Sequence, residues 1–194
     1  MSGEQRRIAV ARLRGGMRVT VRPACPQDAG RVQDYLRGLA PSTRYDRFLG
    51  PLNELSPAEL KRVTHGDDRH MSLIAEAKVG GARTVIGEAR GAVAPDGLTA
   101  EVAVSVADPW RGRGLGALLL QQLECGARGL GAHTLVGDVL RSNAAMKRLA
   151  RKAGFDMTGV PADARLVRIV KDISAPPIGL PCAQLAAAGL SIAA

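Results

Sequence analysis

Aromatic side chains are scarce: one tryptophan, two tyrosines and two phenylalanines occur among 194 residues. Binding of single-stranded nucleic acid relies on aromatic residues interleaved with basic ones, and neither that pattern nor a zinc-finger spacing is present. The three cysteines, Cys25, Cys125 and Cys182, have no CxxC spacing and no histidine at ligand spacing. The sequence therefore predicts neither a nucleic-acid partner nor a metal site.

Lysine is also scarce, with 5 lysines beside 22 arginines, and the formal net charge is +9. This excess favours an anionic ligand or partner, although a solvated basic surface explains it equally well. Long apolar runs are missing too, because prolines and glycines interrupt the uncharged stretch that begins at Ser174. We therefore expect no membrane span, and the N-terminal residues do not indicate a secretory signal. The three cysteines predict no disulfide framework, which fits a reducing cytoplasm.

The length suits one domain with two tails. We assign residues 1–16 to a basic N-terminal arm, 17–172 to the domain, and 173–194 to an apolar tail rich in Pro, Gly and Ala. The sequence leaves homo-oligomer formation open.

The first half of the domain alternates strand and helix patterns. Polar and apolar residues alternate over Arg18–Arg22 and predict a strand that stops at Pro23. Apolar residues then recur at helical spacing over 32–39, and Ser56 and Glu59 form a capping box that begins a second helix. Three strands follow, separated by short Gly-containing turns that predict an antiparallel meander: Met71–Ala77, Thr84–Ala92 and Leu98–Val106.

The second half changes to a βαβαβ rhythm, which brings parallel pairing into the sheet. Its elements after Val106 are a Gly-rich turn, a helix over Gly116–Arg128, a strand over Thr134–Leu140, a helix over Asn143–Lys152 and a strand over Arg165–Lys171. The predicted fold class is α/β, with an antiparallel meander followed by a splayed parallel pair in one mixed central sheet.

The Gly-rich turn Arg111–Gly116 joins a strand to a helix, so the first helical amides and the arginines favour an anion there. Three interpretations compete: a tight connection alone, a phosphate-binding turn, and a dinucleotide-binding turn. For the last, Gly112, Gly114 and Ala117 match G-x-G-x-x-A, and Asp138 follows Gly116 by 22 residues. A meander before the unit and the short chain after it argue against the dinucleotide interpretation.

Two motifs in order carry a resemblance. Arg111-x-x-Gly114-x-Gly116 is similar to the Q/R-x-x-G-x-G/A motif of the GCN5-related N-acetyltransferase (GNAT) superfamily, and the stretch from Asn143 to Phe155 resembles its second motif. The resemblance implies a GNAT-like fold and acetyl-CoA as acetyl donor. It also implies a set of cofactor-binding residues: Val104, Val106, Arg111, Gly112, Arg113, Gly114, Leu115, Gly116 and Asn143.

A narrower resemblance joins Ser42–Phe48, Glu101–Val104 and the stretch from Val139 to Leu149 to the acetyltransferase domain of bacterial Pat-type protein lysine acetyltransferases. It implies a protein lysine as acceptor and Glu101 as catalytic base, with Glu88 on the neighbouring strand as second candidate. A tyrosine that many superfamily members carry is replaced here by Ala150. A small-molecule amine acceptor, or a non-catalytic acyl-CoA-binding or dinucleotide-binding module, remains the alternative.

Overall fold

The computed structural model describes residues 9–175. Its centre is an eight-stranded sheet in the order β1-β2-β3-β4-β5-β6-β8-β7. The strands are β1 Ala9–Arg12, β2 Arg18–Pro23, β3 His70–Val79, β4 Ala82–Val93, β5 Thr99–Val106, β6 Thr134–Leu140, β7 Asp156–Gly159 and β8 Leu166–Asp172. Only the β5–β6 pair is parallel, so the predicted mixed sheet and α/β class are confirmed.

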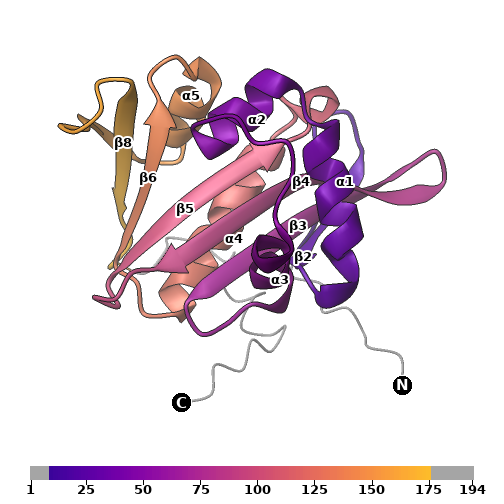
Figure 1. Ribbon diagram of the computed structural model, residues 1–194, viewed down its shortest axis with the longest axis horizontal. Helices are drawn as coiled ribbons and strands as arrows, with labels where there is room; N and C mark the ends of the chain where they lie inside the picture. Colours follow the sequence, from indigo (N-terminus) through magenta and orange to yellow (C-terminus); the bar gives the residue numbers. More distant parts are fainter. Residues whose placement is uncertain (1–8, 176–194) are drawn as a thin grey trace.

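Helices cover both faces of this sheet. They are α1 Ala29–Gly38, α2 Pro41–Phe48, α3 Pro57–His65, α4 Leu115–Gly129 and α5 Ala144–Lys152, with short 3-10 turns η1 Pro26–Asp28 and η2 Asp108–Trp110. Figure 1 shows α4 behind the sheet and α1 and α3 in front of it. The larger core lies on the α4 side, and a smaller one packs around Leu36 and Ile74 beneath α1 and α3. No helix within residues 9–175 has the length and apolar character needed to cross a membrane.

The predicted capping box starts α3. The Ser56 hydroxyl accepts from the Glu59 amide at 3.3 Å, and the Ser56 amide donates to the Glu59 carboxylate at 2.8 Å. Pro57 occupies the first helical position, where its missing N–H costs nothing. Local sequence alone therefore fixes where this helix begins.

The parallel pair is short and splayed, as predicted. β5 and β6 pair only between Thr99–Glu101 and Thr134–Val136, and then diverge. At the next position of β6, a Cβ added to Gly137 would lie 2.8 Å from the Val102 carbonyl oxygen. Glycine is thus required where the two backbones approach most closely before the fork.

Two elements differ from the sequence prediction. Residues 9–12 of the expected N-terminal arm form β1, whose Ala9 is buried against the core, whereas residues 1–8 lie outside the described part. α2 occupies a stretch for which no element was predicted from the sequence. The C-terminal tail is described only as far as Ala175.

The sequence prediction was wrong about the last strand of the βαβαβ unit. The last strand, β8, is antiparallel to β6, because the short strand β7 intervenes and β8 returns between β6 and β7. β7 has only four residues, of which three are exposed, so no apolar alternation marked it.

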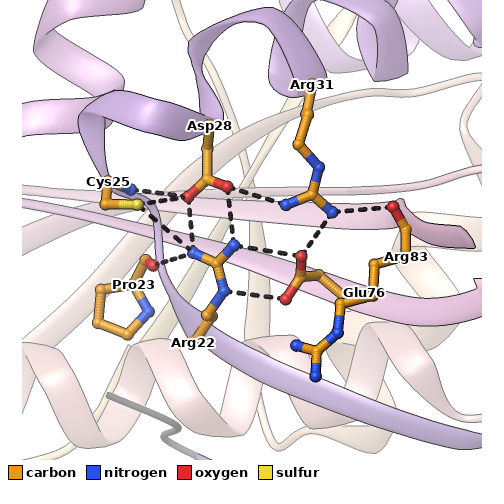
Figure 2. Close-up of polar contacts among 7 residues, drawn as sticks. All are labelled: Arg22, Pro23, Cys25, Asp28, Arg31, Glu76 and Arg83. Atoms are coloured by element: carbon orange, nitrogen blue, oxygen red, sulfur yellow. Dashed lines mark hydrogen bonds and ion pairs between the residues drawn. The ribbon is translucent and has the colours of Figure 1, made fainter. Parts of the chain in front are cut away.

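A group of four charged residues, three of them buried and Arg31 partly exposed, ties β2 to β3 and α1 (Figure 2). We call Arg22, Asp28, Arg31 and Glu76 the balanced cluster, because it contains two guanidinium groups and two carboxylates. All five Arg22 donors are used: Asp28 accepts at 2.6 and 2.7 Å, Glu76 at 2.9 and 3.1 Å, and the Pro23 carbonyl at 3.0 Å. Arg31 adds bonds of 3.0 Å to Asp28 and 2.5 Å to Glu76.

Candidate active site

A cleft of about 380 Å³ opens where β5 and β6 separate. Its walls come from β5, the turn into α4, the C-terminal part of β6, α5 and α2. It therefore lies at the topological switch point of the sheet, where open α/β folds bind their ligands.

The Gly-rich turn forms one end of this cleft. Gly112 and Gly114 have φ of 72° and 95°, a left-handed conformation that side chains disfavour. α4 begins directly afterwards, so its first amides have no acceptor within the helix and face the cleft. Such an arrangement attracts an anion through both the amides and the helix dipole.

Gly116 has a different reason to be glycine. A Cβ at this position would lie 2.9 Å from Leu149 Cδ2, so the missing side chain lets α4 pack closely against α5. The same residue also lines the cleft. The second motif glycine thus couples the two helices that flank the anion-binding end.

Arg111 lines the cleft but is tethered to the fold. Its guanidinium donates to the Thr43 hydroxyl at 2.8 Å and lies 3.3 Å from the Asp108 carboxylate. Thr43 in turn donates to Asp108 at 2.8 Å. This network joins α2 to the Gly-rich turn. Arg113, in contrast, is not part of the lining, and its guanidinium stacks 5.4 Å from the Trp110 ring.

The remaining predicted cofactor-binding residues also line the cleft: Val104, Val106, Leu115 and Asn143. Asn143 is itself the N-cap of α5, because its Oδ1 accepts from the Met146 amide at 2.9 Å. Ala150, which replaces the tyrosine that many superfamily members carry, is fully buried. The structure thus brings the predicted residues together, with Arg113 alone set apart.

A second cavity of about 320 Å³ lies between the sheet and the α2–α3 layer. It shares three residues with the cleft, namely Arg47, Val102 and Ala103. The two spaces therefore meet across β5, at the point where the fork begins. A molecule in the cleft and a molecule in the cavity could approach each other there.

Glu101 lines this second cavity and not the cleft. It is the last β5 residue paired with β6, so it stands at the fork itself. Its side chain is exposed, and within the described residues its carboxylate forms no hydrogen bond or ion pair. An unengaged carboxylate is available to accept a proton.

Glu88, the second candidate base, is buried and fully engaged. Its carboxylate accepts from Arg47 Nε at 2.8 Å, Arg90 Nε at 2.6 Å and the Ser105 hydroxyl at 3.2 Å. Burial alone would raise the pKa of Glu88, but the charges and hydrogen bonds of the two arginines outweigh it, so the pKa lies below its ordinary value. This environment makes Glu88 a poor proton acceptor. We call Arg47, Glu88 and Arg90 the unbalanced cluster, because two guanidinium groups share one carboxylate.

Sequence reasoning missed the contribution of α2. Thr43, Asp46 and Arg47 line the cleft, and burial raises the pKa of the Asp46 carboxyl, opposed in part by the charge of Arg111. The stretch Ser42–Phe48 was noticed only for its resemblance to a family. Arg47 was not recognisable as a site residue because its partner Glu88 lies 41 positions away.

Comparison with known proteins agrees with this geometry. Residues 39–155 match the model of the Acetyltransferase (GNAT) family. An acetyltransferase of Pseudomonas aeruginosa is 33% identical over 147 residues, which cover 75% of this chain and 79% of that protein. A second P. aeruginosa protein, an L-methionine sulfoximine/L-methionine sulfone acetyltransferase, is 44% identical over 61 residues, 31% of this chain and 36% of its own length.

Solved structures give the same fold. The GNAT domain of S. lividans PAT superposes with a TM-score of 0.78 at 27% identity, covering 89% of this chain and all of that domain. A cAMP-binding acyltransferase from Mycobacterium smegmatis superposes with a TM-score of 0.59 at 25% identity; 88% of this chain is covered but only 48% of that protein.

The chain therefore belongs to the GNAT acetyltransferase family. Within that family it is an acetyl-CoA-dependent N-acetyltransferase. This outcome displaces the dinucleotide interpretation of the Gly-rich turn.

Proposed function

We propose that the enzyme moves an acetyl group directly from acetyl-CoA to the side-chain amine of a protein lysine. The observation that carries the proposal is the meeting of the cleft and the second cavity at Arg47, Val102 and Ala103. One space suits the acetyl donor and the other the acceptor, so that donor and acceptor meet at β5.

The cleft has features that suit acetyl-CoA. The N-terminus of α4, with the glycines and Arg111 beside it, provides amides and charge for a pyrophosphate. Beyond Glu101 the β5 edge no longer pairs with β6, so backbone groups at Val104 and the Val106 amide can hydrogen-bond an extended pantetheine arm. The Val106 carbonyl accepts from Arg111 Nε at 3.5 Å. Asn143 at the head of α5 borders the same space.

Glu101 is proposed as the general base. A lysine ammonium has an ordinary pKa near 10.4, so the nucleophile must lose a proton before it attacks the thioester carbonyl. The Glu101 carboxylate, directly or through a water molecule, accepts that proton. A backbone amide at the fork can polarise the thioester oxygen, and the thiolate of the leaving coenzyme A is stable enough to depart without a dedicated acid.

The likeness to the GNAT domain of S. lividans PAT supports a protein acceptor, as does the basic surface, which attracts acidic proteins. The test is to incubate labelled acetyl-CoA with a deacetylated proteome or with a panel of small amines. We expect label on protein lysines with the wild type, and a turnover about 10²–10⁴-fold lower with Glu101→Gln.

The matched control is Glu54→Gln, which removes an exposed glutamate outside both spaces and should leave turnover unchanged. Rapid acetylation of one small amine without enzyme-dependent protein label would reject the lysine acceptor. Wild-type turnover by Glu101→Gln, with normal acetyl-CoA affinity, would reject the assigned base.

The pyrophosphate site has its own test, Gly114→Asp. We expect acetyl-CoA affinity, measured by calorimetry, to fall at least tenfold, because a carboxylate would stand where the phosphates bind. Gly97→Asp is the control: this glycine in the β4–β5 turn also has positive φ and open space around it, but it does not line the cleft. Equal affinity in both folded variants would contradict the assigned site.

A small amino acid is the second candidate acceptor. The stretch of 61 residues that is 44% identical to an L-methionine sulfoximine/L-methionine sulfone acetyltransferase favours it. The panel of small amines in the labelling experiment decides between the two.

A further inference from the structure

The unbalanced cluster has more positive than negative charge. Arg47 and Arg90 each donate through Nε to the single carboxylate of Glu88, so two guanidinium groups share one negative charge. Their side chains are only 9% and 20% exposed. The cluster itself therefore carries a net positive charge in a largely desolvated place, beside a cavity whose wall also contains the carboxylates of Glu59 and Glu101. Such a buried charge is costly without a partner.

Several strong donors of this cluster are unused. The terminal nitrogens of Arg47 and Arg90 donate to no group within residues 9–175, and Arg90 Nη2 is buried as well. A guanidinium has five N–H donors in a fixed planar fork, so both side chains keep a free edge. Buried polar groups normally have partners, and an orphaned donor in a cavity wall indicates a missing acceptor.

The guanidinium groups are also held in place. Those of Arg47 and Arg90 lie 4.9 and 5.9 Å from the Phe48 ring centroid. All three side chains line the second cavity, where Arg62 adds a further exposed arginine that forms no ion pair with the described residues. The cation–π contacts and the Glu88 bonds thus preorganise a site for an anion.

The sheet register places this site next to the proposed base. Arg90 pairs with Ala103 across β4 and β5, whereas Glu101 pairs with Ala92, so Arg90 and Glu101 are diagonal neighbours on one face. Such neighbours have Cα atoms about 7–8 Å apart. An acceptor whose amine meets Glu101 would bring a nearby acidic group within reach of Arg90.

We propose that the second cavity selects acetyl acceptors that carry a carboxylate close to the reacting amine, and that Arg90, with Arg47 and Arg62, binds that carboxylate. The inference rests on the proposed entry of the acceptor through this cavity. In a protein substrate the carboxylate belongs to an acidic residue flanking the lysine; in a free amino acid it is the α-carboxylate. Bidentate binding of a carboxylate is the chemistry for which arginine is best suited.

The test compares matched acceptors that differ only by acid and amide. One pair is a peptide with lysine followed by glutamate and the same peptide with glutamine; the other is leucine and leucinamide. For the wild type we expect kcat/KM to be about tenfold higher for the acid in at least one pair, as a charged hydrogen bond allows. In Arg90→Gln this ratio should fall to nearly one.

The ratio is measured within one enzyme preparation, so partial unfolding of a variant does not alter it. Arg37→Gln, which removes an exposed arginine on α1 outside the cavity, is the control and should keep the wild-type ratio. Where turnover is too slow, calorimetry with the acetylated acid and amide products measures the same preference without catalysis.

The outcomes separate the two proposals. An acid preference in peptides that Arg90→Gln abolishes supports both the anion site and a protein acceptor. The same result with leucine alone supports the anion site and rejects the protein lysine. No acid preference in the wild type, or an unchanged preference in Arg90→Gln, overturns the anion site.

Discussion

Two buried charge clusters lie on the same side of the sheet and differ in one respect. In the balanced cluster, Arg22 and Arg31 face Asp28 and Glu76, and every Arg22 donor has an acceptor. In the unbalanced cluster, Arg47 and Arg90 share Glu88 alone and border a cavity. Because its hydrogen bonds are complete, we interpret the balanced cluster as part of the scaffold. Because the unbalanced cluster lacks an acceptor, we interpret it as part of a binding site.

The largest effect on stability is expected from Asp28→Ala. It removes both bonds from Arg22 to Asp28 and leaves buried positive charge in the balanced cluster. Breaking a buried pair in this way costs about 3–5 kcal/mol of unfolding free energy, measurable by urea denaturation. The folded fraction should keep its kinetic constants, and a loss of activity without loss of stability would contradict a scaffold role.

Glu88→Gln should cost less, about 1–3 kcal/mol, because Arg47 and Arg90 can turn towards water in the cavity. Its kinetic effect should be larger than that of Asp28→Ala, since the two guanidinium groups lose the carboxylate that orients them. We expect the KM of the acceptor to rise while the KM of acetyl-CoA stays nearly constant. A stability loss equal to that of Asp28→Ala, with unchanged KM values, would erase the distinction between the clusters.

Acid should weaken the balanced cluster. Hydrogen bonds and charges from the arginines outweigh burial and hold the pKa values of Asp28 and Glu76 below their ordinary range. A lowered folded-state pKa stabilises the fold above the unfolded pKa of about 4, and this stability is lost as pH falls towards the folded value.

Urea denaturation between pH 7 and pH 3 measures this effect. In Asp28→Asn the fall below about pH 4 should be shallower than in the wild type by up to about 1.4 kcal/mol per pH unit, because one proton fewer is taken up on unfolding. Parallel curves for the two proteins would show that Asp28 does not contribute to acid sensitivity.

The smallest effect is expected at the surface. Arg37 and Glu54 form an ion pair at 2.5 Å, but both side chains are more than half exposed. Arg37→Gln should leave the denaturation midpoint within experimental error, because exposed pairs are screened by water and salt. A clear shift would show that charge pairing stabilises this fold irrespective of burial.

Local patterns account for the parts of the fold that the sequence predicted. The β3–β5 meander has short turns and alternating residues, and the caps and glycines at α3 and α4 act within a few positions. β1 and β7 have four residues each, too few for an alternating pattern to be recognised, although each pairs only with the next strand along the chain, β2 or β8. α2 has only one buried residue, Thr43, and therefore no apolar stripe.

The candidate site also contains residues that the sequence could predict and residues that it could not. Gly112 and Gly114 were found because a turn at a strand-to-helix junction favours glycine locally, and Asn143 was found through the resemblance of the stretch that it begins. The sequence placed Glu101 and Glu88 on neighbouring strands but could not tell which was free, since that depends on Arg47 and Arg90 reaching Glu88. Long-range ion pairing, and with it the second cavity, becomes visible only in three dimensions.

Gly137, the glycine at the fork, concerns the spacing of the strands and not the choice of acceptor. The limit on the approach of β6 at Gly137 is the Val102 carbonyl oxygen, a backbone atom present whatever side chain position 102 bears. The spacing of β5 and β6 at the fork is therefore limited by main-chain contact, whereas side chains on α2, α3 and β4 line the second cavity. Substitutions in those side chains can change which amine is chosen without rebuilding the sheet that positions the thioester.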